Sequence, residues 1–203
     1  MGSAPWSDGR RDAVYLGDAV ERAVKILIVG HFAVGKTTLV GALSEIPPLR
    51  TEEIMTQAGA AVDDLAGVGG KDTTTVAMDF GRLTLNPRLV LYMFGAPGQR
   101  RFQRLWRDMA YGALGALVLA DPRRLDASFS VMDMVEEHGL PYAVAVNRFD
   151  GTPAFDTDAL RTALDLLAET PLVVCDARDR ASAGAALITL VQYLLTRAAK
   201  EHP

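Results

Sequence analysis

Short runs of apolar and β-branched residues recur along the chain and predict the strands of a sheet. The first run, Val24–Val29, reads VKILIV and is typical of a strand buried on both faces. Five further runs predict strands over Thr74–Leu85, Arg88–Phe94, Ala113–Ala120, Tyr142–Asn147 and Leu172–Cys175. Asn86 and Pro87 separate the second run from the third, and this pair predicts a hairpin turn.

Stretches with helical spacing alternate with the later strands. They cover Lys36–Ser44, Arg101–Tyr111, Ser128–His138, Asp156–Ala168 and Ala181–Ala199. The alternation favours an α/β fold with a six-stranded, mostly parallel sheet, one antiparallel edge strand and helices on both faces. Sheets of this kind bind ligands at the carboxyl ends of their strands.

Two segments lack a regular pattern. Residues 1–19 mix Gly, Pro, Arg and Asp without periodicity, and we interpret them as a loose arm before one domain over residues 20–203. Residues Glu45–Thr73 contain no convincing long element. An irregular connection of this length inside a compact domain is usually functional or mobile.

Composition excludes several classes of protein. With 203 residues and 49% hydrophobic content, the chain can build a full core. A net charge of −4 disfavours binding to nucleic acids or anionic membranes, and the single Cys175 excludes an intramolecular disulfide. No secretory leader, lipidation motif or apolar stretch of about 20 residues is visible, so we expect a cytoplasmic protein that reaches a membrane only through a partner.

A phosphate-binding motif follows the first strand directly. The segment matches G-x-x-x-x-G-K-[ST] and reads Gly30-His31-Phe32-Ala33-Val34-Gly35-Lys36-Thr37, with Thr38 next to it. Its backbone N–H groups would surround the phosphates, Lys36 would reach the outer phosphates, and the Thr37 hydroxyl would ligate Mg²⁺. The pattern predicts a P-loop NTPase, but it does not choose between ATP and GTP.

A second motif, at the end of a later strand, points to guanine. Asn147-Arg148-Phe149-Asp150 matches the Asn-Lys-x-Asp of GTP-binding proteins with Arg148 in place of Lys. The Asp150 carboxylate can accept hydrogen bonds from the N1–H and 2-amino groups of guanine, and adenine has no such donor pair. Asn147 would steady the loop, and Arg148 could lay its stem over the base. The competing interpretation is an ordinary polar turn.

Cys175, Asp176 and Ala177, one strand later, resemble the Ser-Ala-Lys loop whose backbone N–H contacts the guanine oxygen. Before the second strand stand three threonines, Thr73 to Thr75. We expect Thr75, with Thr74 as the competitor, to bind Mg²⁺ through its hydroxyl and the γ-phosphate through its N–H. Threonines also simply favour a strand start.

Gly95-Ala96-Pro97-Gly98-Gln99 resembles the Asp-x-x-Gly-Gln of a second switch. Gly98 would donate its N–H to the γ-phosphate and Gln99 would orient the attacking water. Gly95 replaces the usual aspartate, and Phe32 stands where the Ras prototype has glycine and could block an arginine finger. Both features predict slow hydrolysis. Arg50 or Lys71 could supply a cation within the chain.

The helix after this switch has two faces. Phe102, Leu105, Trp106 and Met109 line one face, while Arg100, Arg104 and Arg107 line another. The simpler interpretation is a core face and a solvent face. The alternative is an effector surface formed by the arginines and Trp106.

The ordered motifs GHFAVGKT, TTTVAMDFG, FGAPGQRRF and NRFD resemble those of the Ras-like superfamily. Over Val24–Ala199 the chain is similar to the MglA-related bacterial branch, and especially to the conservon G proteins (CvnD type) of actinobacteria. The resemblance implies a Ras-like G domain that binds GTP/GDP and Mg²⁺, with Gln99, Lys36 and Thr75 as catalytic residues. It also implies signalling beside a roadblock-type regulator and a sensor-kinase-like protein.

Three functions remain at this point. A slowly hydrolysing GTPase switch fits most of the motifs. A GTP-binding interaction module without significant hydrolysis is favoured by Gly95 and Phe32. A P-loop ATPase or kinase would leave Asp150 without a role.

Overall fold

The computed structural model describes residues 19–47, 49–56, 73–98, 102–153 and 155–201. Its elements, in chain order, are β1 (Arg22–Gly30), α1 (Lys36–Leu43), β2 (Leu49–Thr56), β3 (Thr73–Asn86), β4 (Leu89–Gly95), α2 (Gln103–Ala110), β5 (Gly115–Ala120), α3 (Asp126–Glu137), β6 (Tyr142–Asn147), α4 (Thr157–Ala163), β7 (Leu172–Cys175) and α5 (Arg180–Glu201). The predicted arm lies outside the described residues except for Ala19.

The strands form one sheet in the order β2-β3-β4-β1-β5-β6-β7. β1 pairs in parallel with β4 and β5, and the parallel pairing continues through β6 to β7. β3 runs antiparallel to both β2 and β4, and the turn between β3 and β4 lies at Pro87 and Arg88, one residue later than the predicted Asn86-Pro87. The predicted fold class, a mostly parallel sheet with one antiparallel strand, is therefore confirmed, but the antiparallel strand β3 lies one position inside the edge.

The sheet has seven strands rather than the predicted six, because β2 adds a strand beyond β3. It lies inside the Glu45–Thr73 segment, where we expected no regular element. The sequence LRTEEIMT lacks period-two alternation and carries three charged residues, so it gives no clear strand signal. Eight successive residues of β2 pair with β3, from Leu49 opposite Phe80 to Thr56 opposite Thr73, and this tertiary pairing decides the outcome.

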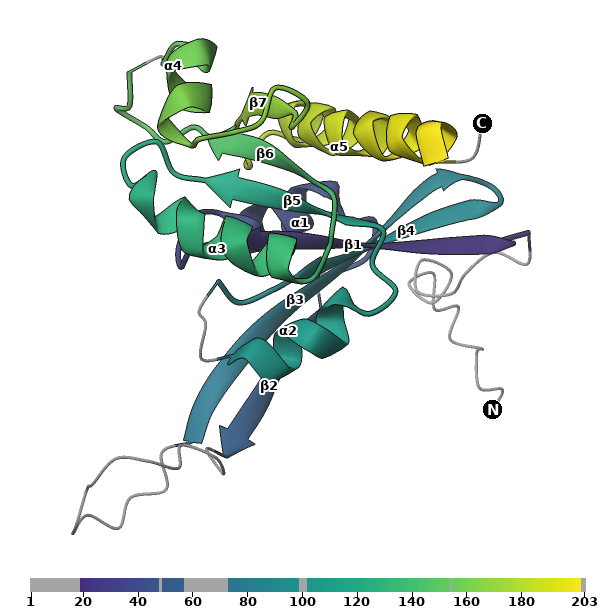
Figure 1. The fold of residues 1–203 in the computed structure, drawn as a ribbon. Helices are drawn as coiled ribbons and strands as arrows, with labels where there is room; N and C mark the ends of the chain where they lie inside the picture. The colour runs from purple at the N-terminus through teal and green to yellow at the C-terminus, as the bar shows by residue number, and fades with distance from the viewer. Residues whose placement is uncertain (1–18, 48, 57–72, 99–101, 154, 202–203) are drawn as a thin grey trace, which may run out of the picture.

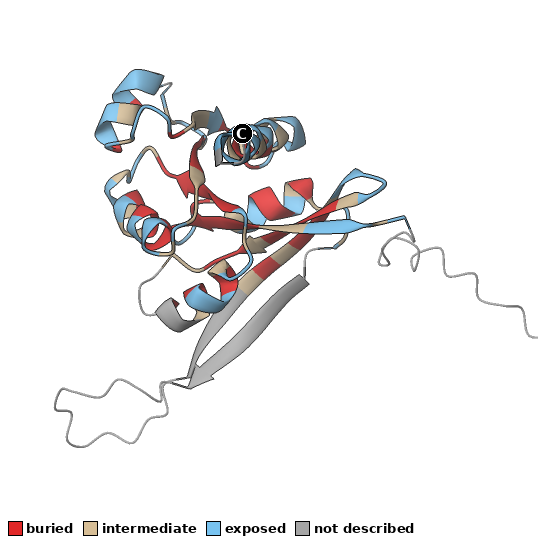
Figure 2. Cartoon of the chain, turned by 45° about the vertical axis from the view of Figure 1, so that its right-hand side comes forward, coloured by how far each residue is buried: buried red, intermediate tan, exposed pale blue. Residues whose placement is uncertain are grey.

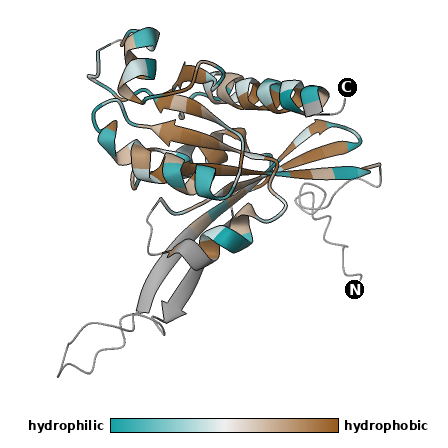
Figure 3. Cartoon of the chain, in the orientation of Figure 1, coloured by the Kyte–Doolittle hydropathy of each residue, from teal (hydrophilic) through white to brown (hydrophobic). Residues whose placement is uncertain are grey.

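Helices cover both faces of the sheet (Figure 1). α1 and α5 pack on one face, through Leu39, Leu43 and Leu190 among others, and α2, α3 and α4 pack on the other. β1, β5 and β6 lie between these layers and are buried, apart from the first residues of β1 and β6 (Figure 2). Their apolar sequences produce the hydrophobic centre seen in Figure 3.

The burial of Trp106 confirms the simpler interpretation of α2, in which one face belongs to the core. Trp106 is fully buried and its indole N–H donates to the Pro97 carbonyl at 2.7 Å, so the alternative of an effector surface that includes Trp106 is wrong. One predicted helix end needs correction. α4 ends at Ala163 instead of Ala168, and Asp165 then adopts a left-handed φ of 49°, which stops a helix. Among the described residues, the helices are too short or too polar to cross a bilayer.

Candidate nucleotide-binding site

The carboxyl ends of β1, β6 and β7 bring three loops together. The first, Gly30 to Thr37, joins β1 to α1 and curves tightly, with left-handed φ values of 151° at Gly30, 63° at Ala33 and 109° at Gly35. A Cβ at Gly30 would lie 2.6 Å from the Leu119 carbonyl oxygen, so only glycine fits there. Such loops direct successive N–H groups into a concavity that binds anions.

Lys36, the first residue of α1, folds back over this loop. Its Nζ donates to the carbonyl oxygens of Gly30 and His31, each at 2.8 Å. Burial lowers the pKa of Lys36 to about 8, and the nearby Asp79 carboxylate offsets part of that shift. A partly buried ammonium group over this loop suits a phosphate, which would stabilise its charged form.

The lowered pKa of Lys36 predicts that phosphate binding depends on pH. In the free protein Lys36 loses its proton as the pH rises through about 8, whereas the phosphates of a bound nucleotide hold that proton. Apparent affinity for a nucleoside diphosphate should therefore fall about tenfold from pH 7 to pH 9. Calorimetric titration would also detect proton uptake on binding near pH 9.

Lys36→Arg is the matched control, because the guanidinium stays charged over this range. The nucleotide base itself titrates over this range and affects both proteins equally. The difference between the pH dependence of the wild type and that of this variant therefore reports on Lys36 alone. Equal pH slopes for the two proteins would contradict the prediction.

Thr37, predicted to ligate Mg²⁺, donates its hydroxyl to the Oδ2 atom of Asp79 at 2.5 Å. Asp79 lies in β3 and is buried. No role for Asp79 was predicted from the sequence. A signal was present, since Asp79 is the charged residue in the otherwise apolar run VAMDF, and a buried carboxylate on a strand is costly unless it has a function or a partner.

Asp79 lies opposite Gly95, the position where the motif of a second switch usually has aspartate. Asp79 pairs with Gly95 across β3 and β4, so both positions face the same spot beside Thr37. A Cβ at Gly95 would lie 3.0 Å from the Asp79 Cβ and 3.2 Å from its Oδ2. The site therefore has room for one carboxylate, and β3 rather than β4 supplies it.

Asn147 joins the three loops. Its Nδ2 donates to the Val34 carbonyl at 2.9 Å, and its Oδ1 accepts the Ala177 N–H at 2.9 Å. Asn147 is buried, and Gly35 allows it to approach, because a Cβ at Gly35 would lie 2.7 Å from Nδ2. The predicted steadying role of Asn147 thus has a geometric basis. The Ala177 N–H, expected to face a base oxygen, is used by Asn147.

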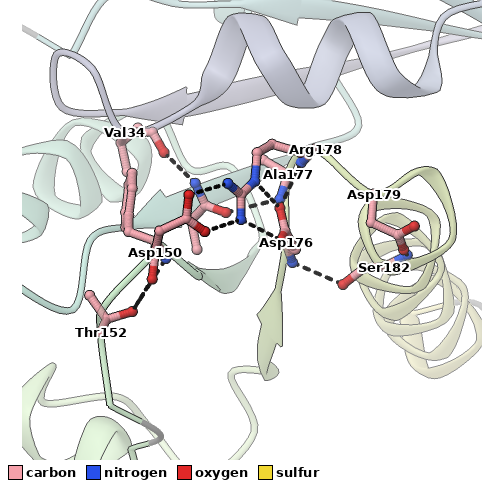
Figure 4. A network of polar contacts seen from close by, with 10 residues as sticks. Val34, Asp150, Thr152, Asp176, Ala177, Arg178, Asp179 and Ser182 are labelled. Atoms are coloured by element: carbon pink, nitrogen blue, oxygen red, sulfur yellow. Dashed lines mark hydrogen bonds and ion pairs between the residues drawn. The ribbon is translucent and has the colours of Figure 1, made fainter.

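Asp150, the predicted base-reading residue, lies on the surface beside the β7–α5 loop. Arg178 Nη1 donates to its Oδ2 at 2.9 Å, and Arg178 Nη2 donates to its Oδ1 at 3.0 Å (Figure 4). The same guanidinium contacts Asp176 through Nε at 3.0 Å and Nη2 at 2.9 Å. No motif in the sequence indicated this role for Arg178, although it directly follows Ala177 in the last loop.

Two other predicted residues, Cys175 and Arg148, contact each other through their backbones. Cys175 has its side chain in the core, where burial raises the pKa of its thiol to about 12, and its carbonyl accepts the Arg148 N–H at 2.7 Å. This bond holds the Asn147–Asp150 loop against β7. The Cys175 side chain is therefore not part of the site.

A buried carboxylate, that of Asp121, lies near the phosphate loop, the segment from Gly30 to Thr37. Asp121 follows β5 and accepts two hydrogen bonds from the Arg123 guanidinium, at 2.9 and 2.7 Å. The Arg123 guanidinium lies 3.7 Å from the centre of the Phe149 ring, next to Asp150. His31 Nε2 lies 4.0 Å from the Asp121 carboxylate. These contacts connect the phosphate loop with the loop that carries Asp150.

The remaining predicted residues divide into three groups. Gly98 approaches the loop closely, since a Cβ there would lie 2.3 Å from the Gly30 carbonyl oxygen. The Phe32 ring, at 79% exposure, and Thr38 in α1 lie at the surface. Thr75 in β3 pairs with Ile54 in β2, but the side chain of Thr75 lies outside the described part of the chain. The same holds for the side chains of Thr73, Thr74, Arg50 and Arg104 and for the whole of Lys71, Gln99 and Arg100.

Sequence comparison places most of the chain in a nucleotide-binding context. A family model described as a conserved hypothetical ATP binding protein matches residues 28–197. An uncharacterized protein of Methanocaldococcus jannaschii is 29% identical over 129 residues, which are 63% of this chain and 71% of that protein.

Solved structures identify the fold. The FeoB G-domain from Methanococcus jannaschii has a TM-score of 0.56 at 15% identity, covering 85% of this chain and 98% of that chain. The cytosolic domain of T. maritima FeoB has a TM-score of 0.58 at 17% identity, covering 85% and 64%. Elongation factor SelB from Methanococcus maripaludis, in complex with the GTP analogue GPPNHP, has 0.56 at 16% identity, covering 87% and 34%. The chain therefore has the fold of a G domain, a nucleotide-binding P-loop fold.

Proposed function

The chain belongs to the family of conserved hypothetical ATP-binding proteins, and we propose that it is a GTP-binding switch that hydrolyses GTP slowly. The observation that carries the choice of base is the position of Asp150. Asp150 follows β6 in the loop that the Asn147 side chain connects to the loop from Gly30 to Thr37. Both carboxylate oxygens of Asp150 accept hydrogen bonds from a pair of N–H donors, which belong to Arg178. Guanine presents such a pair and adenine does not.

The residues of the site fit a nucleoside triphosphate with Mg²⁺. The loop from Gly30 to Thr37 would hold the phosphates, and Lys36 would neutralise their outer charge. Thr37 and Asp79 are oxygen donors already in contact, and Mg²⁺ prefers oxygen ligands. When bound, Mg²⁺ would neutralise charge on the phosphate oxygens. Asp79 would supply the carboxylate that Gly95 cannot.

Hydrolysis would depend on the second switch. Gly98 lies against the phosphate loop at Gly30, where its N–H could meet a terminal phosphate. We propose that Gln99 orients the attacking water and that Thr75 orders the first switch when triphosphate is bound. Phe32 projects into solvent beside the loop, and an arginine supplied by a partner would meet this ring first.

The exposed Phe32 ring predicts a specific pattern of turnover. Single-turnover hydrolysis by the wild type alone should proceed at about 10⁻⁴ to 10⁻² s⁻¹, the range of G domains without an external arginine. Phe32→Gly should change that rate by less than about threefold, because the ring limits the access of a partner and does not touch the reacting groups. Phosphate release measured after rapid mixing gives both rates.

Tyr111→Gly, a second exposed aromatic position at the end of α2, controls for loss of surface apolar area. Fast hydrolysis by the wild type would contradict the prediction. A large acceleration by Phe32→Gly alone would instead show that the ring hinders the chemistry itself.

ATP binding is the second candidate, because the family description names ATP. Competition of GTP and ATP for the protein, together with identification of the nucleotide that co-purifies, separates the two. A GTP preference of about a hundredfold or more supports the proposal, since guanine presents two N–H donors to Asp150 and adenine presents no such pair. Equal affinity would favour an ATPase or kinase.

The finer proposals rest on the resemblance of motifs. They are membership of the MglA-related branch of conservon type, a signalling role, a roadblock-type regulator, a sensor-kinase-like partner, and a cytoplasmic location with recruitment to membranes through a partner. The division into an arm over residues 1–19 and a G domain over residues 20–203 is also a proposal. A pull-down with the protein loaded with GDP or a GTP analogue would test the partners.

A further inference from the structure

One side chain engages both carboxylate oxygens of Asp150. Two N–H groups of the planar Arg178 guanidinium meet Oδ1 and Oδ2 at 3.0 and 2.9 Å (Figure 4). The Asp150 side chain remains 86% exposed in spite of this contact, so the pair lies at the surface where a base can approach it. Bidentate pairing of this type has a defined geometry, unlike a single surface ion pair.

The chemistry of this contact matches that of guanine. The guanine edge presents N1–H and one 2-amino N–H side by side from a common N–C–N unit, which is the unit that a guanidinium group also contains. Arg178 and guanine would therefore use the same two oxygens in the same bidentate arrangement. Adenine presents no such pair and cannot take the place of Arg178.

Arg178 is held beside Asp150 by a second carboxylate. Its backbone N–H and Nε both donate to Asp176 Oδ1, at 2.9 and 3.0 Å, and Nη2 donates to Oδ2 at 2.9 Å. Hydrogen bonds from Arg178 lower the pKa of Asp176 to about 2 and lower that of Asp150, so both carboxylates are charged at neutral pH. Displaced from Asp150, the guanidinium would remain paired with Asp176.

We propose that Arg178 is an internal substitute for the guanine edge: it pairs with Asp150 and is displaced from it by guanine nucleotides. Arg178 is then a specificity-determining residue that lowers the affinity for guanine and leaves that for adenine unchanged. The inference rests on the proposed base-reading role of Asp150.

The test is the affinity of the full chain for GDP and for ADP in Arg178→Ala and Arg178→Lys. Arg178→Ala should bind GDP about two- to fivefold more tightly than the wild type, the range expected for an exposed ion pair, with ADP unchanged. The gain should shrink at high salt, which screens the pair. Arg178→Lys keeps the charge but lacks the paired N–H groups, so it should resemble Arg178→Ala.

Arg180→Ala is the matched control. It removes a positive charge two residues after Arg178, and the Arg180 side chain donates to the Ala42 carbonyl and not to Asp150. Unchanged or weaker GDP binding by Arg178→Ala would overturn the inference, as would Arg178→Lys behaving like the wild type. A wild type that does not prefer GDP to ADP would instead refute the base-reading role itself. Failure of the inference and failure of the proposed function are thus distinguishable.

Discussion

Asp150→Asn is expected to convert the site from guanine to xanthine nucleotides. The amide still accepts the N1–H of the base, but its NH₂ group faces the 2-amino group of guanine, where two donors meet. Affinity for GDP should fall about a hundredfold, and affinity for xanthosine diphosphate should rise by a similar factor, because the 2-oxo group of xanthine accepts from the amide. Competition against a fluorescent nucleotide measures both.

Asp158→Asn makes the same chemical change on the exposed surface of α4 and should alter neither affinity. Because Asp150→Asn also weakens the pair with Arg178, the substitution is best repeated in Arg178→Ala. A loss of GDP affinity without any gain for the xanthine nucleotide would mean that Asp150 acts on the loop and not on the base.

Asp79→Asn is expected to weaken the binding of Mg²⁺ beside the nucleotide. Asp79 is the carboxylate next to the Thr37 hydroxyl, and an amide in its place removes a full negative charge from the proposed cation site. The Mg²⁺ concentration that half-maximally slows nucleotide release should rise at least tenfold, on the order of the loss seen for supporting groups of metal sites. Release of a fluorescent nucleotide in buffered Mg²⁺ gives this midpoint.

Exchange of the two positions provides a sharper version of the experiment. Gly95→Asp alone should be destabilising, because its Cβ would lie 3.0 Å from the Asp79 Cβ and a second carboxylate would enter the same space. The double change Asp79→Gly with Gly95→Asp removes that Cβ contact and should recover much of the Mg²⁺ dependence that Asp79→Gly alone loses. A wild-type midpoint in Asp79→Asn would exclude Asp79 from the cation site.

Local sequence was sufficient for most of the fold and part of the site. The VKILIV run and the motif from Gly30 to Thr37 are contiguous, so strand, loop and helix could be predicted from adjacent residues alone. The Asn147 loop was predicted for the same reason. The geometry then added the contacts of Asn147 with Val34 and Ala177, which no local pattern contains.

The missed features depend on long-range pairing. Asp79 meets Thr37 across 42 positions of sequence, and it does so only because β3 pairs with β4 in one register and α1 packs beside them. Arg178 meets Asp150 because β6 and β7 are neighbours, and β2 forms because β3 offers it a partner. The burial of Trp106 likewise follows from how α2 lies on the sheet, which helical spacing alone left open.

The two hydrogen bonds of Asn147 also bear on how a bound ligand would leave. One amide joins the segment that would hold the phosphates to both segments that would lie beside the base, so we expect the three to separate together and not one after another. Dissociation would then cross a single barrier. The residence time of a nucleotide would be set by how often this one side chain loses both of its partners at once, whichever end of the ligand is held more tightly.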